Sequence, residues 1–566
     1  MKYTAEYVVR SVILCAAAIV ISANVSAAQL EGTVTSVEGA PIPVAMISLF
    51  RDDDLYLETV YADNDGRYAM HTSLSGDLTM RVRSPGYADM STTTTISADE
   101  VNRKDVRLDP LTTDQQISDS LTASSHFTRV RLPDDGAQKL FQNDCLSCHQ
   151  LGNAFTRRPR SKDEWSAVVD RMLGFWNLKP GENPKLIAVY ADLLASAFDG
   201  ALVVKQERHD YDPDHERVMV KEWKYPAAVI AHDATVNSRD GLFYTFDQGN
   251  DNVYITDPKT NVTETITLPA NGMPIGGRLG GMIGNSSAAI TARHGPHSLQ
   301  EGPDGKFYLT LSFANQIGVF DPKTRDLAGY DVEGGAVYPH TLRFDHSGRV
   351  WFSILNSNQI GRFDPATKEM KVINLPTKTN RKEFNGLMPY GIDVNPLDGS
   401  IWYSVLGAQK IGRIDPDSLA IQEFDTPFIG PRRLRFGADG ILWIPAFGEG
   451  KIARLNTATM EYKIYPIPRL TPDGVEVPYA LAVHPDTGDV WITANMSDRM
   501  FRFIPSEERF IAYPLPTRGT YQRDIFFTPD GWVCGPSSPL PAGPTVEGGM
   551  QGLICIITDS TPKTGA

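Results

Sequence analysis

From about residue 216 to 560 the chain repeats itself with a period of roughly 42 to 50 residues, which is the spacing of propeller blades. The two clearest copies occupy residues 338–344, 348–352 and 359–364, and then 389–394, 399–403 and 410–415. Each copy has a strand that begins at Pro, an Asp/Gly turn, an aromatic strand and an Ile-Gly-Arg strand, followed by a last strand. The repeat therefore predicts a β-propeller.

The number of blades follows from counting equivalent positions. First-strand markers occur seven times, at His232, His297, His340, Tyr390, Arg432, Tyr479 and Arg523. Fourth-strand endings also occur seven times, but the one at Pro226 precedes every first strand. We therefore expect residues 218–225 to supply the outer strand of the last blade, which closes the ring and hides both sheet edges.

The seven markers are expected near the mouth of the central channel. Three histidines from successive blades could hold a divalent transition metal. Two arginines and two tyrosines could bind an anionic or phenolic ligand. The alternative is that these side chains fill a polar channel with hydrogen bonds. Long connections at 271–293, 379–387 and 469–476 lie on the same side, and the first, which is Gly-rich, could form a lid, so this side is predicted to be the binding face.

The sequence Cys145-Leu146-Ser147-Cys148-His149 is the pattern that attaches haem c. Two thiols on one helical turn can form thioethers to one porphyrin, and the next imidazole can then ligate the iron. A chance pair, a zinc half-site and a disulfide redox pair are the alternatives. Zinc would need a second ligand pair, and a redox pair would need a βαβ context, both of which the sequence lacks. We therefore predict covalent haem c at Cys145 and Cys148, with His149 as an axial ligand.

Residues 129–212 are predicted to form a small all-helical haem domain, with helices over 135–141, 164–172 and 185–197. Met172 is the nearest candidate for the sixth iron ligand, although it could equally be a core methionine. The other candidates are His209, His215 and Met219. A basic stretch could hold the haem propionates or form a solvated loop; it contains Arg157, Arg158, Arg160 and Lys162.

The N-terminus is predicted to be a signal peptide over residues 1–28. Lys2 and Arg10 flank an apolar run at 12–21 that is short for a membrane span, and small residues precede position 28; an uncleaved anchor is the alternative. No later segment is apolar enough to cross a membrane, so we expect a periplasmic or secreted protein. There Cys534 and Cys555 could form a disulfide or stay free thiols. The net charge of -14 argues against a nucleic-acid or anionic-membrane partner.

Residues 29–112 are predicted to form a small β-sandwich, since short strands at 30–35, 45–50 and 78–82 are separated by turn signals. Asp63 and Asp65 belong to one such turn, with calcium binding as the alternative. Residues 113–128, rich in Thr, Ser and Asp, are predicted to be a linker.

Three family resemblances follow from these motifs. Residues 39–41, 63–68 and 85–87 resemble the turns of the carboxypeptidase regulatory-like domain, which implies a transthyretin-like sandwich without catalytic residues. The Trp-x-x-Val-Val-x-Arg-Met helix at 165–172 and the haem motif resemble a class I cytochrome c domain, which usually completes the iron with a Met sulfur. The repeats resemble the seven-bladed virginiamycin B lyase (streptogramin lyase) family.

That lyase resemblance implies a glutamate, a histidine and a magnesium ion for opening a lactone ring, with the glutamate at the end of the second strand. Here the equivalent positions are apolar, namely Leu311, Ile354, Val405, Ala446 and Ala494. An apolar side chain cannot act as acid, base or magnesium ligand.

The sequence therefore predicts a multidomain, mainly β protein made of a β-sandwich, a small all-α cytochrome c domain and a seven-bladed propeller. Its predicted function is that of an exported c-type cytochrome whose propeller binds a small-molecule substrate or a redox-partner protein. Whether it is a haem-dependent oxidoreductase stays open. A carbon–oxygen lyase and a non-catalytic binding or scaffold protein are the alternatives.

Overall fold

The computed structural model describes residues 28–98, 100–174, 181–280, 290–378, 387–540 and 550–558. The predicted signal peptide lies outside the described residues except for its last position, and so do 281–289 and 379–386 of the long connections. Within the described ranges, no helix is long and apolar enough to cross a membrane.

The N-terminal segment is a sandwich of two sheets. One sheet has the order β4-β1-β7, with β8 also pairing with β1, and the other has the order β3-β2-β5-β6. The strands are β1 (Ala28–Ser36), β2 (Met46–Phe50), β3 (Tyr56–Tyr61), β4 (Arg67–Thr72), β5 (Gly76–Arg83), β6 (Met90–Ile96), β7 (Val101–Arg103) and β8 (Val106–Leu108). Alternate residues of β4 are buried, as expected for a strand with one face on a core. Asp63 Oδ1 accepts the backbone N–H groups of Asp65 and Arg67, which is the bonding of a turn.

Five helices follow, namely α1 (Asp114–Ser120), α2 (Ala123–Phe127), α3 (Asp135–Cys145), α4 (Lys162–Gly174) and α5 (Pro184–Ala197). The prediction of a linker at 113–128 was wrong, because α1 and α2 occupy it. Thr113 accepts the Gln116 N–H, and the Gln116 side chain accepts the Thr113 N–H, so a capping box starts α1. The short 3-10 helix η1 (Pro213–Arg217) then leads into the propeller.

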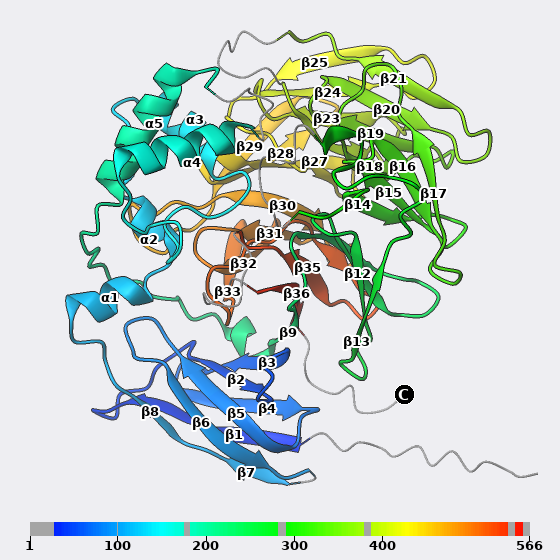
Figure 1. The fold of residues 1–566 in the computed structure, drawn as a ribbon. Helices are drawn as coiled ribbons and strands as arrows, with labels where there is room; N and C mark the ends of the chain where they lie inside the picture. Colours follow the sequence, from blue (N-terminus) through cyan, green and yellow to red (C-terminus); the bar gives the residue numbers. More distant parts are fainter. Residues whose placement is uncertain are drawn as a thin grey trace, which may run out of the picture.

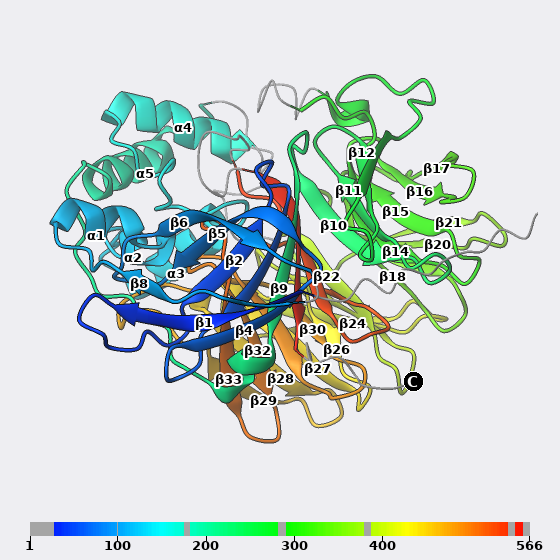
Figure 2. The ribbon, with the colours of Figure 1, turned by 90° about the horizontal axis from the view of Figure 1, so that it is seen from below.

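The helices do not have a core of their own. Phe141, Trp165 and Leu194 from α3, α4 and α5 belong to the same buried cluster as Tyr390 and Tyr479 of the propeller. The prediction of a small separate all-helical domain is therefore corrected: these helices complete one apolar core together with one end of the propeller. Figure 1 shows α3, α4 and α5 against the ring, and Figure 2, viewed from the sandwich side, shows the helices grouped on one side of it.

The propeller consists of seven groups of four antiparallel strands. The first six are β10 (Ala231–Val236) to β13 (Thr263–Thr267), β14 (Pro296–Glu301) to β17 (Leu327–Asp331), β18 (Pro339–Phe344) to β21 (Met370–Asn374), β22 (Pro389–Val394) to β25 (Ile421–Asp425), β26 (Arg435–Phe436) to β29 (Glu461–Pro466) and β30 (Pro478–Val483) to β33 (Arg509–Pro514). We call them blades 1 to 6. Second strands such as β19 (Val350–Ile354) are buried at every residue, whereas outer strands such as β25 are only half-buried.

Blade 7 combines both ends of the propeller sequence. It has the order β34 (Phe526–Phe527), β35 (Val533–Ser537), β36 (Gln551–Ile557) and β9 (Met219–Tyr225), so the predicted closing strand is confirmed. A disulfide joins Cys534 to Cys555 across β35 and β36. However, β9 does not end the sheet, because its other edge pairs with β3 of the sandwich. Blade 7 and one sandwich sheet therefore form a continuous sheet of eight strands.

Candidate functional site

The seven first-strand markers occupy equivalent places around the channel. Five of them are the second residues of β10, β14, β18, β22 and β30, while Arg432 and Arg523 precede the short strands β26 and β34. Each of the seven side chains is at most 4% exposed. The prediction that they share one level of the ring therefore agrees with the strand positions, but they fill the mouth instead of lining an open pocket.

The histidine half of this ring is a stack. The ring centroids of His232 and His297 lie 3.7 Å apart, and those of His297 and His340 lie 4.0 Å apart. Burial lowers the pKa of His232 to about 4 and takes the pKa values of His297 and His340 well below the usual range. Burial therefore favours the neutral form of all three imidazoles. The described part of the chain contains no group of three or more His, Cys, Asp or Glu residues arranged to hold a metal ion.

The other half of the ring surrounds Arg432. Its guanidinium lies over the Tyr479 ring at 3.8 Å and over the Phe447 ring at 4.2 Å, and it donates to the Tyr390 hydroxyl at 2.6 Å. The Tyr390 hydroxyl donates in turn to the Tyr479 hydroxyl at 2.7 Å. Burial raises the pKa of Tyr479, but the positive charges of Arg432, Arg523 and Arg433 outweigh burial and lower it.

The segment Cys145–His149, which we call the motif, lies directly on this half of the ring. Three consecutive carbonyl groups of the motif accept hydrogen bonds from propeller side chains. Tyr521 Oη donates to Leu146 O, Arg432 Nη2 donates to Ser147 O at 2.9 Å, and Arg523 Nη2 donates to Cys148 O at 2.8 Å. We call these three propeller residues the carbonyl clamp. The predicted ligand-binding arginines of the ring therefore bind a segment of the chain itself.

A second set of contacts holds the residue after the motif. Gln150 Nε2 donates to Asp498 Oδ1 at 3.0 Å and to Thr520 O at 2.9 Å. Gln150 is 2% exposed and Asp498 is 6% exposed. The motif is thus fixed to blade 6 and to the connection that follows it, in addition to the carbonyl clamp.

The sequence analysis missed the next level of the channel. Arg433 Nη1 lies 3.0 Å from Asp233 Oδ2 and 2.9 Å from Asp524 Oδ2, so one guanidinium joins blades 5, 1 and 7. Burial raises the pKa of Asp233, but Arg433 and His232 hold it well below its usual value. The signal was available, because these three residues each follow a first-strand marker and carry complementary charges.

The two cysteines and the histidine of the motif have different surroundings. Cys145 and Cys148 are unpaired thiols, and Cys148 is exposed. The His149 ring is held through Nδ1, which lies 2.9 Å from Gln150 O. A ligating imidazole commonly donates its other N–H to a backbone carbonyl, because that bond fixes the ring orientation and leaves Nε2 for the metal. Burial lowers the pKa of His149, which favours the neutral ring.

The candidates for the sixth ligand lie in different surroundings. Met172 is half-buried near the end of α4, and its neighbour Arg171 is close enough to His149 to lower the pKa of that imidazole. His215 Nε2 instead bonds to Ala512 O at 2.8 Å, and Met219 is buried in the sandwich core. His209 lines a cavity of about 390 Å³ between the sandwich, α1 and blade 6.

The basic stretch after the motif contacts its own surroundings. Arg157 pairs with Asp119 of α1 at 3.4 Å, Arg158 lies over the Phe155 ring, and Arg160 lies over the Trp165 ring at 4.9 Å. Lys162 pairs with Asp192 of α5 at 2.7 Å. These contacts brace the helices, and a role toward propionates stays a prediction.

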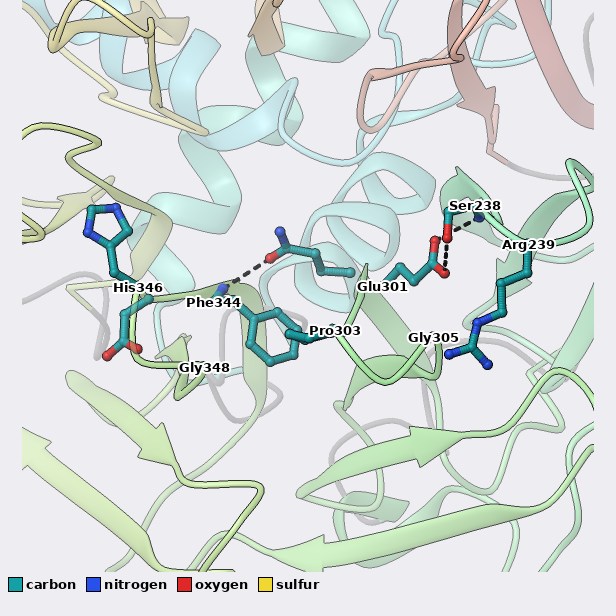
Figure 3. Close-up of a pocket in the computed structure, with 11 residues that line it drawn as sticks. Ser238, Arg239, Glu301, Pro303, Gly305, Phe344, His346 and Gly348 are labelled. Carbon is teal, nitrogen blue, oxygen red and sulfur yellow. Dashed lines mark hydrogen bonds between the residues drawn. The ribbon is translucent and has the colours of Figure 1, made fainter.

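The positions at which the lyase resemblance would need glutamates are all buried and apolar. Leu311, Ile354, Val405 and Ala446 are 0% exposed, and Ala494 is 2% exposed. A cavity of about 550 Å³ opens elsewhere, beside residues 238–239, 302–305 and 345–348. These residues follow the ends of first strands whose beginnings carry the ring histidines, so the cavity in Figure 3 lies at the other end of the channel from the motif.

Comparisons with known proteins agree with two parts of this description. A model of the virginiamycin B lyase family matches residues 285–475 and 385–535, and a model of the carboxypeptidase regulatory-like domain matches residues 29–109. The propeller is similar to the virginiamycin B lyase family. Neither of these two models covers the helices or the motif at Cys145–His149. No curated protein matches the chain.

Solved structures include similar chains. The selenomethionine-substituted virginiamycin B lyase from Staphylococcus aureus is 21% identical, covers 60% of this chain and 99% of its own, and has a TM-score of 0.47. A streptogramin B lyase structure gives 21% identity, coverages of 60% and 98%, and a TM-score of 0.47. Hydrazine synthase from Kuenenia stuttgartiensis is 14% identical, with coverages of 55% and 93% and a TM-score of 0.42.

Proposed function

We propose that this chain is an exported c-type cytochrome in which Cys145 and Cys148 carry haem covalently and His149 ligates the iron. The observation that supports it best is the state of the motif: two unpaired thiols, one of them exposed, next to an imidazole whose Nδ1 is already held by a carbonyl. The haem would supply one-electron transfer. The chain's residues would fix the motif, exclude water from its buried side and leave Cys148 accessible for attachment.

The sixth ligand in this proposal is Met172. Its side chain is half-buried and does not belong to the apolar core that α4 forms through Trp165, Val169 and Leu173. A methionine placed only for packing would be expected in that core. A Met thioether as the second axial ligand would raise the reduction potential relative to a second histidine.

We place the protein in the periplasm or outside the cell, with a small-molecule substrate or a redox-partner protein as electron donor or acceptor. The disulfide between Cys534 and Cys555 supports an oxidising compartment. A carbon–oxygen lyase of the virginiamycin B lyase type has no support at the five apolar positions, since none can act as an acid, a base or a magnesium ligand.

The test is an absorbance spectrum of the protein exported from a host that can attach haem c. The dithionite-reduced wild type should show the sharp α-band of haem c, and the Cys145→Ala/Cys148→Ala variant should not. A Cys534→Ala/Cys555→Ala variant is the matched control, because it loses two cysteines but should keep the band. A wild type without the band overturns the proposal.

A further inference from the structure

Resting on the proposed function, we infer that the carbonyl clamp, made of Arg432, Tyr521 and Arg523, positions the motif and raises the reduction potential of its haem. The clamp holds the segment where α3 ends at Cys145. A helix leaves its last carbonyl groups without intrahelical partners, and the residues that follow need donors from elsewhere. Here blade 5 and the connection before β34 supply one donor to each of the three carbonyls.

The clamp donors are themselves fixed by the propeller. Arg523 Nε donates to Ser538 Oγ at 2.6 Å, and Arg523 Nη2 also lies 3.2 Å from Ser538 O. Arg432 is held between two aromatic rings and by the Tyr390 hydroxyl, and its Nη1 donates to Ser147 Oγ at 3.2 Å. These contacts hold both guanidinium groups in one orientation. In that orientation they donate to the carbonyl groups of the motif.

The two arginines of the clamp differ from Arg433 in their partners. Within the described ranges, neither Arg432 nor Arg523 has a carboxylate within ion-pair distance, although they are 1% and 4% exposed. Arg433 differs, because Asp233 and Asp524 neutralise it. Two buried positive charges thus lie beneath the backbone that carries His149. A charge in a buried, poorly screened place acts over a longer distance than one in water.

The sign of the effect follows from the electron balance. Haem held by the motif would take up one electron from the redox partner, and no bond would form or break. The site would then carry one positive charge less, so fixed cations nearby would favour the reduced form and raise the potential. Arg432 and Arg523 are positioning residues, since they donate to backbone carbonyl groups of the motif.

A potentiometric titration of the haem-loaded, full-length protein tests the inference. We expect Arg432→Gln and Arg523→Gln to lower the midpoint potential, while Arg523→Lys, which keeps the charge, should shift it less. Arg362→Gln is the matched control, because Arg362 is also buried and also donates to a carbonyl, that of Pro416, but lies in blade 3. Midpoints of both glutamine variants that equal those of the wild type and the control, with the α-band intact, would overturn the inference.

A second measurement needs no haem. In the Cys145→Ser/Cys148→Ser protein, the Leu146 amide, which donates to Gln142 O at the end of α3, should exchange slowly, and Tyr521→Phe in that background should speed its exchange. Tyr513→Phe, a change of the same kind in a buried tyrosine of β33, should not. Fast exchange without the tyrosine change would show that the clamp is not formed. A wild type that carries no haem would overturn the proposed function, whereas unchanged midpoints in loaded variants would overturn this inference alone.

Discussion

The disulfide between Cys534 and Cys555 permits a quantitative prediction of the propeller's stability. It closes a loop with a sequence separation of 21 between two neighbouring strands of blade 7. A cross-link of this loop length lowers the entropy of the unfolded chain by an amount equal to about 3 kcal/mol of stability. Because β36 also pairs with β9, the bond supports the blade in which the ring closes.

The expected change in melting temperature follows from the size of the propeller. From β9 to β36 the propeller has about 340 residues, and a melting entropy of about 2.1 cal/mol/K per residue gives about 0.7 kcal/mol/K. A loss of about 3 kcal/mol therefore lowers the melting temperature by about 4 °C. We expect this shift in the Cys534→Ala/Cys555→Ala variant, in the propeller transition of a calorimetric scan.

The control is the wild type measured after reduction. It should melt at about the temperature of the double alanine variant, since both lack the cross-link but only one lacks the sulfur atoms. If the variant and the oxidised wild type melt together, the entropic argument is refuted. If the reduced wild type keeps the higher temperature while a thiol assay shows the bond open, packing and not the cross-link explains the stability.

Three further predictions concern the contacts that join the sandwich, the helices and the propeller. Trp223→Ala should lower the free energy of unfolding by about 3 to 5 kcal/mol in a denaturant titration, because the buried indole packs on Tyr56 of the sandwich and Phe243 of blade 1; a change below about 1 kcal/mol would contradict the shared-sheet joint. Burial lowers the pKa of His126 to about 4 in the folded protein, below the value of the unfolded chain. The neutral imidazole should therefore contribute about 3 kcal/mol to the free energy of unfolding, in full above pH 6.5 and less as the pH falls toward 4. His126→Gln should flatten that part of the stability profile, and an unchanged slope would speak against a buried neutral imidazole. Glu207→Ala should release α1 and α2, since the carboxylate accepts bonds from Thr122 and Ser125, and limited proteolysis should then cut within 113–128; equal resistance to protease would argue that other contacts dock these helices.

The propeller could be predicted because its sequence is periodic. Equivalent positions in successive repeats must occupy equivalent places, so the repeat alone assigns the markers from His232 to Arg523 to one level of the ring. The closing strand followed from an ending at Pro226 with no first strand before it. The pairing of that strand with β3 could not be predicted, since nothing in an edge strand's sequence names the partner on its other side.

In the helical segment, one feature could have been predicted from the sequence and another could not. Thr113 and Gln116 form a capping box, which is visible in the sequence, yet the composition of 113–128 favoured a linker. The carbonyl clamp is different, because it joins residues 285 to 375 positions apart and its acceptors are backbone atoms that carry no sequence signal.

The central claim is that Cys145 and Cys148 hold haem covalently, and the mass of the denatured, unreduced chain tests it most directly. The account predicts that the exported wild type keeps the added mass of one haem after denaturation and acid extraction, on the peptide that contains residues 145–149. The Cys145→Ala/Cys148→Ala variant should lose it. A wild-type peptide of unmodified mass, with two free thiols, would contradict the account.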